Sequence, residues 1–233
     1  GAVVGDLQKK VAKHGLFYPP DPSSKNFCTI GGNVACNAGG LRCVKYGVTR
    51  DYVLSLSGYL PTGEFVRWGR DTRKFATGYN LRDLWIGSEG TLGVVTEITV
   101  RLILAVPNRI TFLGAFSDDQ AALNAPLAVG KLGIRPSIIE YMDQWTIDCL
   151  QKYVGEEVFT GVEPKPMVLI ELDGSKESLT QDAILVEQWL KSDSLNYKRA
   201  DDDGESEKLW EVRRQGSSSM KKLATTKLNE DIV

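Results

Sequence analysis

The spacing of apolar residues at the start of the chain predicts a single short helix. Val3, Leu7 and Val11 recur at helical intervals, and Gly15 supplies a stop signal, so we expect a helix over residues 4–14. The only histidine, His14, falls at the end of this helix, where it would interact with the helix dipole.

Extended patterns follow this helix. The prolines at positions 19–22 exclude a helix and predict a rigid turn. Alternating apolar residues over 52–60 and 64–68, on either side of the turn at 61–63, predict a β-hairpin. Strands over 93–105 complete a first unit.

From Pro107 the pattern changes to alternating strands and helices, so we divide the chain into residues 1–106 and 107–233. Ser117 is expected to cap the first helix of the second part, and Pro126 to kink it. Short connections favour an α+β fold with an antiparallel, ferredoxin-like sheet covered on one face. Strands are expected at 110–116, 134–140, 167–173 and 195–200, and helices at 118–132, 143–153, around 179–190, and 206–215.

Composition describes an ordinary globular chain. It has 233 residues, 42% of them hydrophobic, and a formal net charge of −2, which gives no electrostatic case for nucleic acid. No apolar stretch is long enough to cross a membrane. A basic cluster over 213–222 follows an acidic run over 201–207, and it is either a solvated face or a site for a small anionic substrate.

The reactive residues narrow the chemistry. A single histidine excludes a multi-histidine metal site within the chain, and it excludes a catalytic triad unless His14 serves it. Cys28, Cys36, Cys43 and Cys149 show no C-x-x-C spacing, so reduced thiols are expected rather than a disulfide framework. Cys36 is expected near a ligand, either as an attachment point or as a small residue in a tight loop.

Two glycine-rich segments carry the strongest signal. The first reads T-I-G-G-N-V-A-C-N-A-G-G over 29–40, and the second reads G-S-E-G-T-L-G over 87–93 and leads into a β-branched run. Glycine permits positive φ and lets backbone N–H groups approach a pyrophosphate. Two such turns could clamp one nucleotide-like cofactor. Neither matches the Rossmann or P-loop signature, so both of those folds are disfavoured.

Five segments together resemble one family, the FAD-linked oxidases of the vanillyl-alcohol oxidase (PCMH) type. Within it the chain is most similar to the glycolate oxidase flavin subunit and to the D-lactate and D-2-hydroxyglutarate dehydrogenases. The segments are P-P-D-P-S-S over 19–24, the first glycine segment, K-Y-G-V-T-R-D over 45–51, T-G-Y-N-L over 77–81, and G-S-E-G-T-L-G-V-V-T-E over 87–97.

The resemblance implies an FAD-binding domain over 1–106 followed by a substrate-binding domain over 107–233. FAD would be the cofactor, and Glu89 would either contact it or cap its turn. The implied FAD contacts are Pro20, Asp21, Ser23, Ser24, Gly31, Gly32, Asn33, Ala35, Asn37, Ala38, Gly39, Gly40, Gly87, Ser88, Glu89, Gly90, Gly93 and Val95.

The resemblance also implies a cation for the substrate carboxylate. Arg213 matches the arginine that relatives use for this purpose; the alternative is a surface arginine paired with Glu211 or Glu207. Ser217 and Lys227 stand where secondary substrate contacts would lie. Arg50 either places a charge near the flavin or pairs with Asp51.

The implied reaction is oxidation of a D-2-hydroxy acid, with glycolate or D-lactate as the expected substrate. The relatives' N-terminal FAD subdomain and histidine-rich C-terminal segment have no counterpart here, so the chain is expected to be a fragment without a proton acceptor, poor in FAD retention and inactive alone. The alternatives are a non-catalytic flavin-binding or docking module of an electron-transfer complex, and a flavoenzyme of the same fold with another substrate. Electron-acceptor subunits are the expected partners, and the location is cytoplasmic or at a membrane through those subunits.

Overall fold

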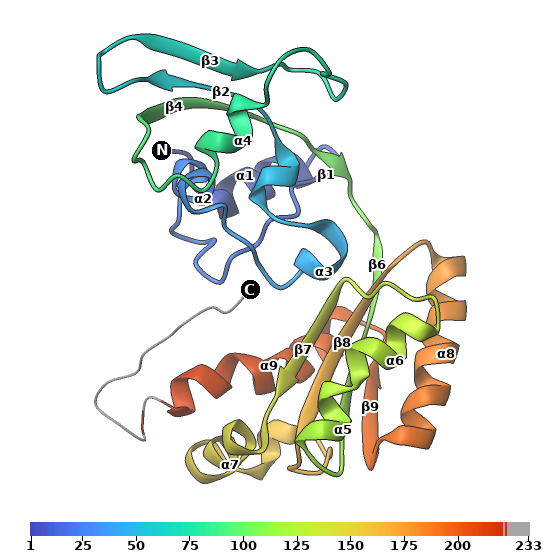
Figure 1. The fold of residues 1–233 in the computed structure, drawn as a ribbon. Helices are drawn as coiled ribbons and strands as arrows, with labels where there is room; N and C mark the ends of the chain where they lie inside the picture. Colours follow the sequence, from blue (N-terminus) through green and yellow to red (C-terminus); the bar gives the residue numbers. More distant parts are fainter. Residues whose placement is uncertain (221, 223–233) are drawn as a thin grey trace. The chain divides into compact units, whose positions relative to one another are not determined.

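The computed structural model describes residues 1–220 and residue 222. It divides the chain into two compact units, Gly1–Val106 (unit 1) and Pro107–Val233 (unit 2). Each unit is considered by itself below, and Figure 1 gives the labels of the elements. Among the helices of the described residues, none combines the length and the apolar character that crossing a bilayer would demand.

Unit 1 joins short helices to a small antiparallel sheet. The predicted helix is present as α1 (Val4–Ala12), and the predicted hairpin as β2 (Val53–Tyr59) and β3 (Phe65–Gly69). Its remaining elements are β1 (Leu16–Phe17), α2 (Ile30–Cys36), α3 (Cys43–Tyr46), a 3₁₀ turn η1 (Thr49–Tyr52), α4 (Leu81–Trp85), β4 (Val94–Val100) and β5 (Ile103–Leu104).

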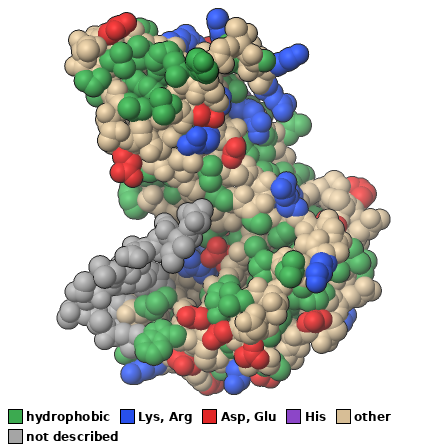
Figure 2. Space-filling model, viewed as in Figure 1, with side chains coloured by type: hydrophobic (Ala, Val, Ile, Leu, Met, Phe, Trp, Pro, Cys, Tyr) green, Lys and Arg blue, Asp and Glu red, His purple; other side chains and the backbone are tan. Residues whose placement is uncertain are grey.

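The sheet of unit 1 has the strand order β3-β2-β4, and β1 pairs separately with β5. Val34 of α2, Leu56 of β2 and Trp85 of α4 are buried in one core cluster, so α2 and α4 pack against this sheet. At one end of the sheet, Tyr59 pairs with Phe65 and with Val94, and all three side chains are substantially exposed. Figure 2 shows hydrophobic side chains gathered over this sheet.

Unit 2 is built on one four-stranded antiparallel sheet with the order β7-β8-β6-β9. Numbered from one within the unit, this order is 2-3-1-4, the arrangement of a ferredoxin-like sheet, as predicted. Its elements are β6 (Asn108–Ala115), α5 (Asp119–Leu123), α6 (Ala125–Lys131), β7 (Ile138–Met142), α7 (Gln144–Tyr153), a 3₁₀ turn η2 (Glu156–Phe159), β8 (Met167–Gly174), α8 (Lys176–Asp193), β9 (Asn196–Ala200) and α9 (Asp203–Met220).

Helices cover both faces of this sheet, so the prediction of a single covered face was wrong. Phe112 and Ile170 face a core shared with α5, α6 and α8. On the opposite face, Trp210 of α9 donates its indole N–H to the buried Glu171 of β8 at 3.2 Å, and α7 packs against α9. Figure 1 shows α6 and α8 on one side of the sheet and α7 and α9 on the other. Successive side chains of a strand point to opposite faces of the sheet. Because buried residues occur on both faces here, each face is covered by its own layer of helices.

Two helix boundaries also differ from the predictions. The expected helix over 118–132 is two helices that meet at Asn124, immediately before Ala125-Pro126. Proline fits the first turn of a helix, where its missing N–H costs nothing, so Pro126 stands in the first turn of α6 instead of kinking one helix. Asp118, and not Ser117, caps α5 by accepting the Ala121 amide at 2.9 Å.

Candidate functional site

The first glycine segment folds as a short helix, which its glycine content did not predict. Gly31 and Gly32 lie inside α2, and the Thr29 hydroxyl caps the helix by accepting the Gly32 amide at 3.1 Å. The residue with positive φ is Asn37, at 48°, which ends the helix in the left-handed region. The prediction that this segment forms a turn is therefore wrong for Ile30–Cys36, and the turn lies at Asn37.

The second glycine segment is a turn of the kind that was predicted. Gly87, Glu89, Gly90 and Gly93 all have positive φ, between 52° and 154°. A Cβ at Gly93 would lie 2.3 Å from the Tyr59 carbonyl oxygen, so only glycine fits there. This segment therefore needs glycine for two reasons, the positive φ angles of the turn and the close packing of its backbone.

The two segments meet. The Gly87 amide donates to the Val34 carbonyl at 2.9 Å, and the Glu89 amide donates to the Ala35 carbonyl at 2.8 Å. A Cβ on Gly87 would also touch the Asn37 side chain at 3.4 Å. We call this junction of residues 29–40 and 87–93 the two-segment site. It places two turns that lie fifty residues apart in the sequence on one local surface of unit 1.

Arg50 belongs to this site through backbone acceptors. Its guanidinium donates to the Asp83 carbonyl at 3.1 Å and to the Ile86 carbonyl at 2.9 Å, and its own amide donates to the Asn37 side chain at 3.0 Å. The alternative of a pair with Asp51 is not what the structure has, since the Asp51 carboxylate accepts the Val48 amide at 2.8 Å. Arg50 thus ties the turn after α2 to the start of the second segment and brings a positive charge there.

One buried donor in the site is unsatisfied. Asn33 of α2 is 2% exposed, and its side-chain nitrogen has no hydrogen-bond partner among the described residues. An unpaired buried amide costs free energy comparable to a lost hydrogen bond, so such a group points to a partner supplied by a ligand or by water. The side-chain NH2 group of Asn33 can donate a hydrogen bond to an oxygen atom of a phosphate or a carbonyl group.

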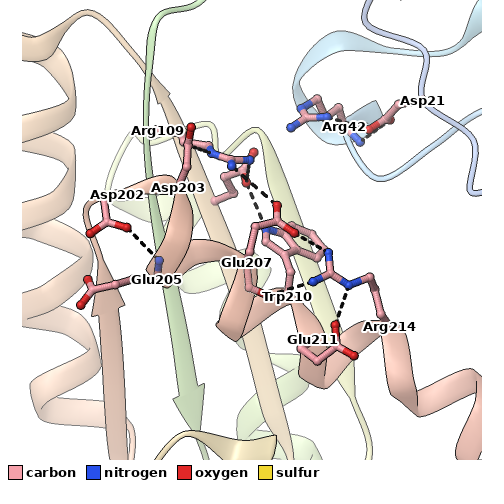
Figure 3. Close-up of polar contacts among 11 residues, drawn as sticks. Asp21, Arg42, Arg109, Asp202, Asp203, Glu205, Glu207, Trp210, Glu211 and Arg214 are labelled. Carbon is pink, nitrogen blue, oxygen red and sulfur yellow. Dashed lines mark hydrogen bonds and ion pairs between the residues drawn. The ribbon is translucent and has the colours of Figure 1, made fainter. Parts of the chain in front are cut away.

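Asp21 has a structural partner in the segment that ends the first glycine run. Its carboxylate forms an ion pair with Arg42 at 2.8 Å, shown in Figure 3, and a Cβ on Gly40 would lie 2.5 Å from Asp21 Oδ1. Burial raises the pKa of the Asp21 carboxyl, although Arg42 opposes the shift. Asp21 therefore holds residues 40–42 in place.

The other predicted residues lie on the elements around this junction. Ser23 is exposed, and the Ser24 carbonyl accepts the amides of Phe27 and Cys28 at 2.9 Å, in a turn that follows the prolines. Cys36, at the end of α2, is an exposed free cysteine. The remaining members, Pro20, Ala38, Gly39, Ser88 and Val95, lie in the loops before and after α2, in the second segment and on β4.

In unit 2, Arg213 lies on α9 and pairs with Glu140 of β7 at 2.6 Å. The expected alternative, a pair with Glu211 or Glu207, is wrong for Arg213 and describes Arg214 instead. Arg214 binds Glu207 at 2.7 Å and Glu211 at 3.0 Å, as Figure 3 shows.

Two predicted substrate contacts cannot be placed. Ser217 lies in α9, but only its backbone is described, and Lys227 lies outside the described residues. Among the residues described, no group of histidine, cysteine, aspartate and glutamate side chains is arranged to hold a metal ion.

Comparison with known families decides the classification. Residues 107–233 match the family model of the C-terminal domain of FAD linked oxidases, and residues 1–69 match the model of an FAD binding domain. The chain belongs to the FAD linked oxidases. In this family the fold observed here is expected, and the predicted resemblance is confirmed.

Two relatives illustrate the family. The chain is 38% identical over 232 residues to the glycolate oxidase subunit GlcD of Bacillus subtilis, covering 99% of this chain and 49% of that protein. It is 36% identical over 219 residues to the D-lactate dehydrogenase of Anaerostipes hadrus, covering 91% of this chain and 46% of that one. The chain thus spans just under half the length of these relatives.

A solved structure supports the fold. An alkyldihydroxyacetonephosphate synthase superimposes with a TM-score of 0.69 at 22% identity, covering 95% of this chain and 41% of that one. A similarity at this level of sequence identity shows that the fold is shared, and it does not show that the two proteins catalyse the same reaction.

Sequence reasoning missed two residues of the site region. Glu140, the partner of Arg213, lies 73 positions away in the chain, and no local motif marks it. Arg42, the partner of Asp21, lies 21 positions away. The single carboxylate of Asp21 among prolines could have indicated that a cationic partner is needed, because a buried carboxylate is stable only when it is paired.

Proposed function

We propose that the protein is an FAD-dependent dehydrogenase that oxidises a D-2-hydroxy acid, glycolate or D-lactate, to the 2-oxo acid. The observation that carries the proposal is the two-segment site, where the second glycine segment is hydrogen-bonded to α2, the helix that carries the unsatisfied side-chain amide of Asn33. The match of residues 1–69 to an FAD binding domain and the names of the relatives support it.

The residues of the two-segment site fit FAD in their chemistry. Small side chains let a ligand come close to the backbone, and the Asn33 side-chain amide is a donor for an oxygen of the cofactor. FAD, when bound, supplies the hydride acceptor for this oxidation. Arg50, held by the Asp83 and Ile86 carbonyls, contributes a fixed positive charge beside the turn, which favours an anionic group there.

Arg213 is the proposed anchor for the substrate carboxylate. A guanidinium binds a carboxylate through two parallel hydrogen bonds, which fixes the orientation of a small hydroxy acid as well as its position. Ser217 and Lys227 are proposed as secondary contacts on the same substrate. The Bacillus relative is a subunit of glycolate oxidase, which supports electron transfer to a partner subunit here.

The first test is spectroscopic. The protein expressed from its complete gene should carry a yellow flavin spectrum, and anaerobic addition of D-lactate or glycolate should bleach it. A preparation without flavin would contradict the proposal. A flavin that no 2-hydroxy acid or other alcohol bleaches would favour the non-catalytic module.

The second test is a matched pair of arginine variants. Arg213→Met should raise KM for D-lactate by about 100-fold, because a charge-assisted bidentate contact is lost, while the flavin spectrum stays unchanged. Arg214→Met is the control, since Arg214 already binds Glu207 and Glu211, and it should leave KM within about twofold. Equal losses for a neutral alcohol substrate in the Arg213 variant would refute the assigned role.

A further inference from the structure

The guanidinium of Arg213 is held at one position by a carboxylate from another element. Its Nε donates to Glu140 Oε2 at 2.6 Å, a short charge-assisted hydrogen bond from α9 to β7. The Glu140 side chain is 20% exposed and that of Arg213 is 38% exposed. The pair therefore lies at the edge of the unit 2 core, where one partner is largely fixed and the other reaches solvent.

The rest of the Arg213 fork has no partner among the residues that the structure describes. Within the described chain, Glu140 is the only partner found for this guanidinium, and the contact involves only the Nε atom of Arg213. The neighbouring Arg214 differs, because its Nε, Nη1 and Nη2 donate to Glu211, to the Glu207 carboxylate and to the Glu207 carbonyl. Arg213 thus offers the Nη1–Nη2 end of its fork, with its orientation already fixed.

We infer that Glu140 is a positioning residue that also makes the site select monocarboxylates over dicarboxylates; this rests on the proposed function. Fixing Nε reduces the side-chain entropy that Arg213 loses when it binds a substrate carboxylate. The charge of Glu140 acts as well. Arg213 is already neutralised once, so Arg213, Glu140 and one substrate carboxylate sum to −1, and a second nearby carboxylate would bring this sum to −2. The proposed contact from Lys227 adds the same positive charge in both cases and leaves the difference unchanged.

This inference predicts a change in selectivity. Like charges within several ångströms at a partly buried site repel strongly, so we expect Glu140 to disfavour a dicarboxylate by about tenfold or more. Glu140→Gln keeps an oxygen to accept the Nε–H but removes the charge. The ratio of kcat/KM for D-lactate to that for D-malate should therefore fall by about tenfold.

The experiment uses the flavin-loaded protein from the complete gene. Glu211→Gln removes one acidic charge from α9 without touching Arg213 and should leave the ratio unchanged. Glu140→Asp keeps the charge but shortens the reach by one methylene, so KM for D-lactate should rise about tenfold while the ratio stays near that of the wild type.

The outcomes separate the two proposals. If the wild type oxidises D-lactate and the ratio does not move in Glu140→Gln, the inference on Glu140 is overturned and the proposed function stands. If none of glycolate, D-lactate and D-malate reduces the flavin of the wild type, the proposed function itself fails. Should Glu140→Gln not retain flavin, Glu140→Asp decides, and an unchanged KM in that variant contradicts the positioning role.

Discussion

At the scale of single residues, the glycines of the first segment do different work. Gly31 lies within α2, and a Cβ there would meet its nearest neighbour at 3.9 Å. Gly40 faces the Asp21 carboxylate and backbone at 2.5 to 2.6 Å, closer than real Cβ contacts come. Composition alone makes both residues equal candidates for a backbone role, whereas the close approach of Asp21 decides that, of the two, only Gly40 must be glycine.

This difference predicts opposite effects of the same substitution. Gly40→Ala should lower the free energy of unfolding by about 1–3 kcal/mol, because the methyl group must displace Asp21 and its pair with Arg42. Gly31→Ala should raise it by about 0.5–1 kcal/mol, because alanine is the better helix residue. Urea unfolding followed by circular dichroism would measure both. Equal stabilities for the two variants would contradict this account.

Charged residues show what sequence reasoning can and cannot supply. It singled out Arg50 and Arg213 as candidates, but it offered only neighbours in the sequence, such as Asp51 and Glu211, as partners. The observed partners are carbonyl groups over thirty positions away for Arg50, and Glu140 for Arg213. Such pairings depend on which elements pack together, and this information is absent from any local window.

At the scale of elements, periodicity predicted most helices and strands, and the failures have local causes. The helix α2 was missed because glycine disfavours a helix by about 1 kcal/mol per residue relative to alanine. The Thr29 cap and the burial of Ile30 and Val34 offset this preference. The break before Pro126 was read as a kink, because the sequence does not say whether a proline stands inside a helix or at its first turn.

The contact between α8 and β9 gives a prediction for pH. Glu187 accepts hydrogen bonds from Tyr197 at 2.9 Å and from Arg199 at 3.0 Å. The Tyr197 hydroxyl, with help from Arg199, holds the pKa of Glu187 below its ordinary value of 4.5. A depressed carboxyl pKa stabilises the fold above the unfolded pKa, and this contribution is lost as the pH falls through the lower folded value.

Glu187→Gln should therefore lower the free energy of unfolding at pH 7 by about 1 kcal/mol or less, because the pair is partly exposed. The difference from the wild type should shrink as the pH falls below 4.5. Asp182→Asn, on the same helix, controls for removing one acidic charge. Denaturant titrations at pH 7 and pH 3.5 would measure these differences, and a gap at pH 3.5 as large as the gap at pH 7 would exclude the linkage.

At the scale of the whole molecule, each unit has its own hydrophobic core. All four strands of the sheet in unit 2 contribute residues to its core, with Phe112 and Ile170 buried and Ile139 and Tyr197 partly buried, and helices cover both faces. The change of pattern at Pro107 marked this division in the sequence. The antiparallel order was predictable from short connections, whereas the second helical layer was not, because the apolar pattern of a helix does not say which face of the sheet the helix covers.

A unit with its own core should fold by itself. We expect residues 107–233, expressed alone, to unfold in one cooperative transition, and their amide resonances to overlay on those of the same residues in the whole chain. Heteronuclear NMR and thermal circular dichroism would measure this. A fragment with collapsed amide dispersion would show instead that unit 2 depends on unit 1.

The order of strands in unit 2 has a consequence for synthesis on the ribosome. The strand β6, whose residues Phe112 and Leu113 are fully buried in the finished unit, is made first, immediately after Pro107. Both strands that pair with it are made much later, β8 from Met167 and β9 from Asn196. The apolar side chains of β6 therefore stay exposed while most of the unit is translated. We expect chaperones to bind the nascent chain most strongly in that interval.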